Sequence, residues 1–198
     1  ENKAMQNNKE PAPLVAWLAL AGFLIFLCGV TGLWAFLERI GTDIGVTANQ
    51  MGTLLGILKL VGGLSGLTVI YASAKYGIRW PQIVAFLCVL IGVSILHLTQ
   101  SVAGYAAGTW IWEYGFSLGT SYQFAAIARL DTSKRLVLLI PTCIGLAGMI
   151  GPALAGYIKR GDSYANIYIM AVIFALVSLV IYMIIFSKKR MAMMFEQE

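Results

Sequence analysis

Six long apolar stretches limit the folds open to this chain more than any other feature of its sequence. They cover residues 13–37, 48–74, 81–98, 102–128, 136–158 and 164–186. A helix needs roughly 20 mostly apolar residues to cross the ~30 Å hydrocarbon core of a bilayer. The stretches are continuous and lack the two-residue alternation of barrel strands. The sequence therefore predicts an all-α membrane protein with six transmembrane helices.

The composition argues against a soluble enzyme and against a disordered chain. Of the 198 residues, 59% are hydrophobic and 12% are charged, whereas a soluble domain carries about 25% charged residues. Disorder requires low hydrophobicity and high net charge. The net charge of +5 comes from short basic clusters between apolar stretches, a pattern typical of membrane orientation rather than of nucleic-acid binding. We expect the lipid bilayer as a partner and no nucleic acid.

The basic residues divide unequally between the two sides of the predicted bundle. Ten lie on the side of both termini: Lys3, Lys9, Lys75, Arg79, Arg129, Lys134, Arg135, Lys188, Lys189 and Arg190. Three lie on the other side: Arg39, Lys159 and Arg160. Positive residues concentrate in the cytoplasm, so both termini are predicted there, in a bacterial inner membrane. Residues 1–13 are then a cytoplasmic linker, 14–187 the transmembrane bundle and 188–198 a cytoplasmic tail.

A weak internal repeat relates the first three stretches to the last three. The second and fifth stretches are rich in glycine, whereas the third and sixth hold little glycine and many Val, Ile, Leu and Phe residues. Each repeat has an odd number of spans, so the two triplets must be inverted relative to each other, as in many transporters. We therefore expect two inverted three-helix repeats.

Two charged residues, Lys59 and Glu113, lie deep inside apolar stretches. Each is twelve residues from a polar outer border, Thr47 or Ser101, which corresponds to ~18 Å at ~1.5 Å per residue. Ionisable groups at this depth are costly and normally face a partner or a water-filled cavity. We expect the two to lie close together across a central cavity. A role in binding substrate or protons and a purely architectural ion pair both remain open.

Polar and aromatic residues near these charges extend the candidate site. Thr109, Glu113 and Ser117 recur every four residues and share one helix face, with Trp110 beside them. Lys59 lies on a stripe of glycines, and small residues let helices approach closely, so we expect Lys59 to point at protein rather than lipid. The predicted substrate- and proton-binding residues are Lys59, Glu113, Ser117, Trp110 and Thr109.

The fifth stretch contains Gly151 and Pro152 within a series of glycines. The glycines predict close packing, and a proline inside a helix removes a backbone hydrogen bond and can kink it. A gate and a plain helix contact are both consistent with this pattern. We expect neither a metal site nor a cofactor, because the three cysteines lack metal-ligand spacing and no nucleotide-binding fingerprint is present.

One enzyme motif is present, Gly-Phe-Ser-Leu-Gly around Ser117. A serine nucleophile needs a base within hydrogen-bond reach. The only histidine, His97, lies near the outer end of the third stretch. An intramembrane serine hydrolase is therefore the least favoured interpretation, and we do not expect an enzyme.

Residues 74–81, Ala-Lys-Tyr-Gly-Ile-Arg-Trp-Pro, resemble the short D-R-x-G-R-R-P loop of the major facilitator superfamily. Lys75, Gly77, Arg79 and Pro81 match this pattern, whereas Ala74 replaces the acidic residue. With its six spans and cytoplasmic ends, the whole chain resembles the C-terminal half of such a transporter, helices seven to twelve.

The resemblance implies secondary active transport of a small organic solute, and we expect this transport to be coupled to protons. It implies that the first and fourth spans line a central cavity, that the third and sixth face lipid, and that Gly77 and Arg79 belong to a gating loop. The expected partners are the solute and a missing N-terminal six-helix half, because the binding site is shared between halves. The alternative is a non-transporting six-helix membrane subunit or scaffold.

Overall fold

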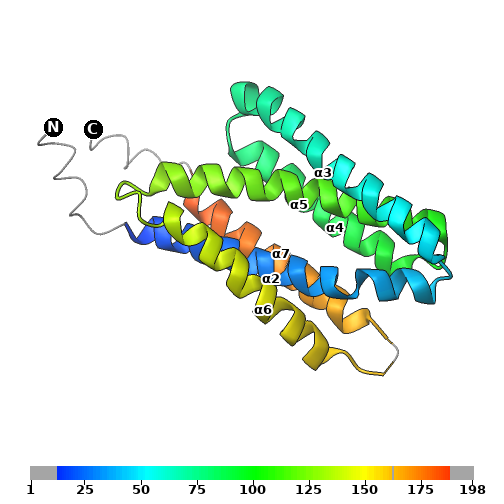
Figure 1. Ribbon diagram of the computed structural model, residues 1–198. Helices are drawn as coiled ribbons and strands as arrows, with labels where there is room; N and C mark the ends of the chain where they lie inside the picture. Colours follow the sequence, from blue (N-terminus) through cyan, green and yellow to red (C-terminus); the bar gives the residue numbers. More distant parts are fainter. Residues whose placement is uncertain (1–12, 162, 188–198) are drawn as a thin grey trace, which may run out of the picture.

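The computed structural model describes residues 13–161 and 163–187, and these form a bundle of helices that run side by side (Figure 1). The elements are α2 (Leu14–Asp43), α3 (Ala48–Tyr76), α4 (Arg79–Leu98), α5 (Val102–Leu130), the short 3-10 helix η1 (Val137–Leu139), α6 (Ile140–Ile158) and α7 (Ala165–Ile185). The all-helical fold is confirmed for these residues. Apart from Pro13, the predicted linker (1–13) and tail (188–198) lie outside them.

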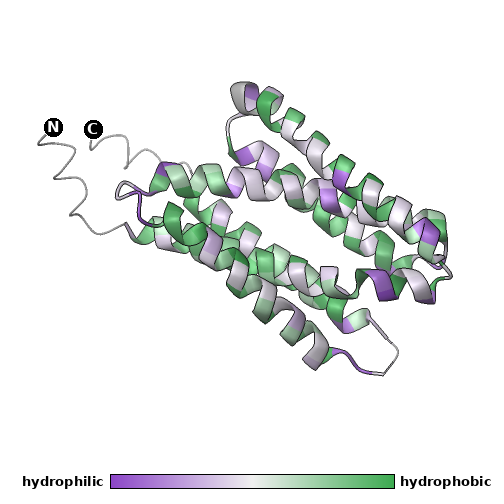
Figure 2. Ribbon diagram, in the orientation of Figure 1, coloured by the Kyte–Doolittle hydropathy of each residue, from purple (hydrophilic) through white to green (hydrophobic). Residues whose placement is uncertain are grey.

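Five of the long helices are apolar and long enough to span a membrane: α2, α3, α4, α7, and α6 together with η1. These helices indicate an integral membrane protein, and Figure 2 shows apolar colouring along most of their length. Within the described residues α5 does not join this group, because it carries the predicted polar row. Its 29 residues nevertheless extend for about 44 Å beside α3 and α4. Residues 13–161 and 163–187 thus contain six long helices, of which five have the expected apolar character.

The helices pack in two groups. α2 packs against α6 and α7, α5 packs against α3 and α4, and smaller contacts between α4 and α7 and between α2 and α5 join the groups. Figure 1 shows α3 and α6 at opposite edges of the bundle. The first helix of each sequence triplet thus packs mainly against the second and third helices of the other triplet.

Glycines allow the closest helix approaches. A Cβ atom on Gly92 of α4 would lie 2.5 Å from the backbone nitrogen of Trp112 on α5. A Cβ atom on Gly151 of α6 would meet the Cys28 carbonyl and the Thr31 hydroxyl of α2, and Thr31 donates a 2.7 Å hydrogen bond to the Ala147 carbonyl. The close packing predicted for the glycines of the fifth stretch is found at Gly151, with α2 as its partner. It is not found at Gly145, Gly148 and Gly156, where a Cβ atom would meet no described residue within 4 Å.

Asp131 organises the connection between α5 and η1. The Ser133 hydroxyl donates to its Oδ1 atom at 2.7 Å, and the backbone N–H groups of Leu136 and Val137 donate to its Oδ2 atom at 2.7 and 3.2 Å. Burial alone raises the pKa of Asp131, but these hydrogen bonds to the charged form outweigh burial and hold the pKa below its ordinary value. The ionised carboxylate therefore stabilises the folded loop.

We expect Asp131→Asn to lower the free energy of unfolding by about 1–3 kcal/mol, because charge-assisted hydrogen bonds are lost. The folded-state pKa is lowered, so the contribution of Asp131 is complete above its unfolded pKa of about 3.9 and is lost as the pH falls through the folded pKa. Thermal unfolding measured from neutral to acid pH tests this. The difference between wild type and variant should shrink at low pH, and a constant difference would contradict the assignment.

Candidate functional site

Two N-terminal caps set the depth of the candidate site. Thr47 caps α3 in a capping box with Gln50, and the Ser101 hydroxyl accepts the N–H of Gly104 at the start of α5. Lys59 and Glu113 each follow their cap by twelve residues. The polar borders that the sequence identifies are thus the helix starts, and the two charges lie at equal distances along their helices.

Lys59 and Glu113 form an ion pair across the α3–α5 interface. Lys59 Nζ lies 3.0 Å from Glu113 Oε1. The two side chains differ in exposure: 59% for Lys59 but 4% for Glu113. The expected proximity of the two charges is confirmed. The carboxylate lies inside the bundle, and the ammonium lies at its open surface.

Gly62 and Ser117 surround the buried carboxylate. A Cβ atom on Gly62 of α3 would lie 2.9 Å from both Glu113 Oε1 and Ser117 Oγ. Gly62 therefore lets α3 pass close to α5 at the level of the ion pair. The second carboxylate oxygen, Glu113 Oε2, is buried and has no hydrogen-bond partner among the described residues. Lys59, Glu113 and Ser117 are thus brought together as predicted.

Trp34 of α2 completes this site, and the sequence interpretation missed it. Lys59 Nζ lies 4.3 Å from the centroid of the Trp34 ring, a cation–π distance. Trp34 also stacks on Trp112 with centroids 6.2 Å apart, and Trp112 stacks in turn on Phe116. Trp34 lies nine residues before the end of α2, or about 14 Å. The same count of residues from the helix ends that placed Lys59 and Glu113 at one depth could have identified Trp34 in the sequence.

Two predicted binding residues have structural contacts instead. Trp110 Nε1 donates a 3.1 Å hydrogen bond to the Leu54 carbonyl, which links α5 to α3. Thr109 is buried, and its hydroxyl donates to the Ala106 carbonyl within α5 at 2.9 Å. Both lie within one turn of Glu113, but neither contacts the ion pair in the described structure.

The glycine stripe of α3 faces away from the other described residues, contrary to the expectation that it packs on protein. A Cβ atom at each of its members would meet nothing within 4 Å: Gly52, Gly56, Gly63 and Gly66. α3 contacts α5 through another face, where Leu58 and Gly62 lie. Lys59 lies on this open stripe, and its long side chain reaches Glu113 and yet remains exposed.

The other predicted residues lie apart from the ion pair. Gly77 ends α3 with φ +64°, a backbone conformation that favours glycine, and Arg79 begins α4 as an exposed side chain. Gly151 and Pro152 lie on α6, where Gly151 packs against α2. None of these four residues is brought to Lys59 and Glu113, so a gating role for them stays a prediction.

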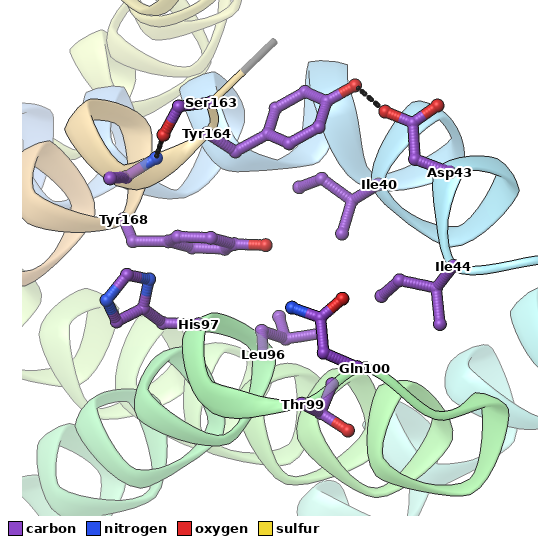
Figure 3. Close-up of a pocket in the computed structure, with 11 residues that line it drawn as sticks. Ile40, Asp43, Ile44, Leu96, His97, Thr99, Gln100, Ser163, Tyr164 and Tyr168 are labelled. Atoms are coloured by element: carbon purple, nitrogen blue, oxygen red, sulfur yellow. Dashed lines mark hydrogen bonds between the residues drawn. The ribbon is translucent and has the colours of Figure 1, made fainter.

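His97 lies far from Ser117. Its ring packs 5.3 Å from that of Tyr168, and both line a cavity of about 310 Å³ between the ends of α2 and α4 and the start of α7 (Figure 3). Beside this cavity the Tyr164 hydroxyl donates to Asp43 Oδ2 at 2.6 Å and links α7 to α2. The structure therefore does not provide His97 as a base for Ser117.

No cluster of three or more His, Cys, Asp or Glu side chains in the described part of the chain could hold a metal ion. Comparison of the sequence and the structure with known protein families, curated proteins and solved structures gives no match.

Proposed function

We propose that this chain is one six-helix half of a proton-coupled secondary transporter for a small organic solute, with both termini in the cytoplasm. The observation that carries the proposal is the Lys59–Glu113 ion pair, formed midway along two helices at an open surface. A charge at this depth is costly in lipid and normally marks a site where the protein binds ions or substrates. A carboxylate that exchanges a proton next to a solute site is the element such coupling requires.

The packing supports the two inverted three-helix repeats. α2 uses α6 and α7 as its main neighbours, and α5 uses the corresponding helices α3 and α4. Two of the smaller contacts, α4 with α7 and α2 with α5, each join helices at the same place in the two triplets. The first helix of each triplet packs on the other triplet in this way when a two-fold axis relates two inverted triplets, an arrangement found in many transporters.

The unpartnered glycines support a second half as the missing partner. The α3 stripe has a counterpart on α6, where Gly145, Gly148 and Gly156 also meet nothing within 4 Å. Small residues at a helix surface permit close helix–helix contact in a membrane. α3 and α6 are the second helices of the two triplets, so a further six-helix half can cover both while leaving Lys59 beside a shared cavity.

Glu113→Gln tests the transport proposal. In proteoliposomes that contain the whole transporter and an internal pH dye, addition of a transported solute should move protons with the wild type. We expect the variant to lose this proton movement and to retain exchange of labelled for unlabelled solute. Glu38→Gln, at an exposed carboxylate further along α2, is the control and should behave as wild type. Equal proton movement in both variants would contradict a coupling role for Glu113.

The open α3 and α6 faces also fit the alternative, a membrane subunit that assembles with other helices without transporting anything. In that case neutralisation of Lys59 and Glu113 disturbs assembly, and no solute of any class moves protons. The proteoliposome assay therefore separates the two functions.

A further inference from the structure

The ion pair is asymmetric in a way that bears on the charge of the solute. Of its two side chains, Lys59 is 59% exposed and Glu113 is 4% exposed. A solute that approaches from the open surface meets the ammonium first and the carboxylate only behind it. We propose that the site takes a monovalent organic anion, whose charged group binds Lys59, and that Glu113 takes up one proton as the anion binds. This inference rests on the proposed transport function.

The chemistry of the ammonium supports an anionic ligand. Lys59 has three N–H donors and no acceptor. One donor is directed to Glu113 Oε1 at 3.0 Å, and the ring face of Trp34 lies 4.3 Å from Nζ. The exposed side of Nζ remains for a carboxylate, sulfonate or similar acceptor group. An organic cation is disfavoured, because the same ammonium repels it before it can reach Glu113.

Charge balance links the anion to a proton. Lys59 and Glu113 together carry no net charge, so a bound monovalent anion leaves one negative charge among apolar helices, where an uncompensated charge is unfavourable. One proton from the water on the side of anion entry restores neutrality. Glu113 Oε2 can accept it, since this atom has no hydrogen-bond partner among the described residues. The anion and the proton then cross together with no net charge.

Trp34 indicates the nature of the solute body. Trp34 is 39% exposed, and its ring lies directly beside the ammonium. The ring of Trp112, which is fully buried, is stacked on it at an interplanar angle of 16°. The Trp34 ring is therefore held in place and presents a flat apolar surface next to the charge. This surface fits an anion with an apolar or aromatic body.

Other ionisable groups near Glu113 do not compete for this role. On α2, Glu38 lies one turn beyond Trp34 and is exposed. On α4, the nearby ionisable side chain is Cys88, which packs against the α5 backbone. On α5 itself, the Tyr114 hydroxyl is hydrogen-bonded to Thr68 at 2.7 Å. Lys59 is the group that forms an ion pair with Glu113.

The test uses the purified whole transporter and three probes that share one ring: benzoate, benzamide and benzylammonium. Acetate and indole-3-acetate vary the size of the anion. Binding is followed as a rise in unfolding temperature, since a ligand of the folded state stabilises it. Proton uptake is followed with a pH-indicator dye in weakly buffered solution. We expect stabilisation by carboxylates but not by benzamide or benzylammonium, with about one proton taken up per bound anion.

Variants assign the effect to the two side chains. Lys59→Gln should weaken anion binding about 10- to 100-fold, as expected for the loss of a charged hydrogen-bond donor, whereas Lys59→Arg should retain binding. Glu113→Gln should bind the anion without proton uptake. If Lys59→Gln folds poorly, the double variant Lys59→Gln/Glu113→Gln leaves no charge stranded and should also lose anion binding. The control is Lys159→Gln, because Lys159 also lies beside an aromatic ring, that of Tyr164, but not beside the pair.

Several results would overturn the anion proposal: no response to any carboxylate, equal stabilisation by benzylammonium, unchanged affinity in Lys59→Gln, or anion binding without proton uptake in the wild type. Its failure is distinguishable from failure of the transport function. Solute-driven proton movement with a cation alone would preserve transport and reject the anion. Anion binding with proton uptake, but without movement across the vesicle membrane, would preserve the anion site and reject transport.

Discussion

Replacing Lys59 by methionine should destabilise the protein by up to about 3–5 kcal/mol, the range expected when a buried charge loses its partner. The cost arises at Glu113, whose carboxylate is buried and loses its charged partner. Glu113→Gln should cost much less, about 0–1 kcal/mol, because the remaining ammonium is largely exposed and pairs of that kind contribute little. The double variant should recover most of the stability lost in Lys59→Met.

Thermal unfolding of the whole protein, with both single variants and the double variant, measures this asymmetry. Lys159→Met is the matched control, at a lysine beside an aromatic ring but without a carboxylate partner, and should change stability by less than about 0.5 kcal/mol. Equal losses in the two single variants would contradict the exposure difference on which the prediction rests.

The same double variant separates a functional pair from an architectural one. If the pair only stabilises the bundle, the double variant should fold and transport. If the pair binds solute and proton, the double variant should fold but fail to couple transport to protons. A fully active double variant that still couples solute to protons would end the functional assignment of Lys59 and Glu113.

Gly151→Val should separate α2 from α6. A side chain at Gly151 would meet the backbone of α2 at Cys28 and at Gly32, where the Gly32 nitrogen lies 2.9 Å from the Cβ position. Backbone cannot move aside as a flexible side chain can, so we expect a loss of at least about 1–3 kcal/mol, the usual cost of overpacking. Gly148→Val on the same helix is the control, because a Cβ atom there meets nothing within 4 Å.

Thiol labelling gives a local measurement of this change. Cys28 of α2 and Cys143 of α6 are both buried, so separation of the two helices should expose them to a maleimide. We expect faster labelling of both cysteines in Gly151→Val and wild-type labelling in Gly148→Val. Slow labelling in both variants, with unchanged unfolding temperature, would show that the α2–α6 contact tolerates a side chain at Gly151.

Gly148→Val also bears on the proposed second half. If that half covers the α6 glycines, the valine should leave Cys28 and Cys143 protected but weaken the association of the two halves. In that case the valine at position 151 would affect folding of the six-helix unit, and the valine at position 148 would affect its assembly with the second half.

Helix number, helix position and the depth of the charges could be predicted from the sequence. Each apolar stretch gave one long helix, with α3 beginning at Ala48 and α4 ending at Leu98 as expected. Polar residues such as Thr47 and Ser101 cap the helices that follow them, because their side chains accept hydrogen bonds from free backbone N–H groups. Helix length in lipid and helix capping both depend on residues that are close together in the sequence, so they can be predicted from one sequence. The meeting of Lys59 with Glu113 followed from two such equal depths.

Which face of each helix is covered was decided by tertiary structure. The glycines of α3 and those of α6 have the same pattern, yet Gly62 and Gly151 pack tightly while their neighbours remain open. Periodicity tells which residues share a face, but in a membrane both lipid and protein interior are apolar, so hydrophobicity does not tell what covers that face. For the same reason Trp34 joined the site only when α2 was placed beside α3. The separation of His97 from Ser117 likewise depended on how α4 and α5 pack, which no local pattern encodes.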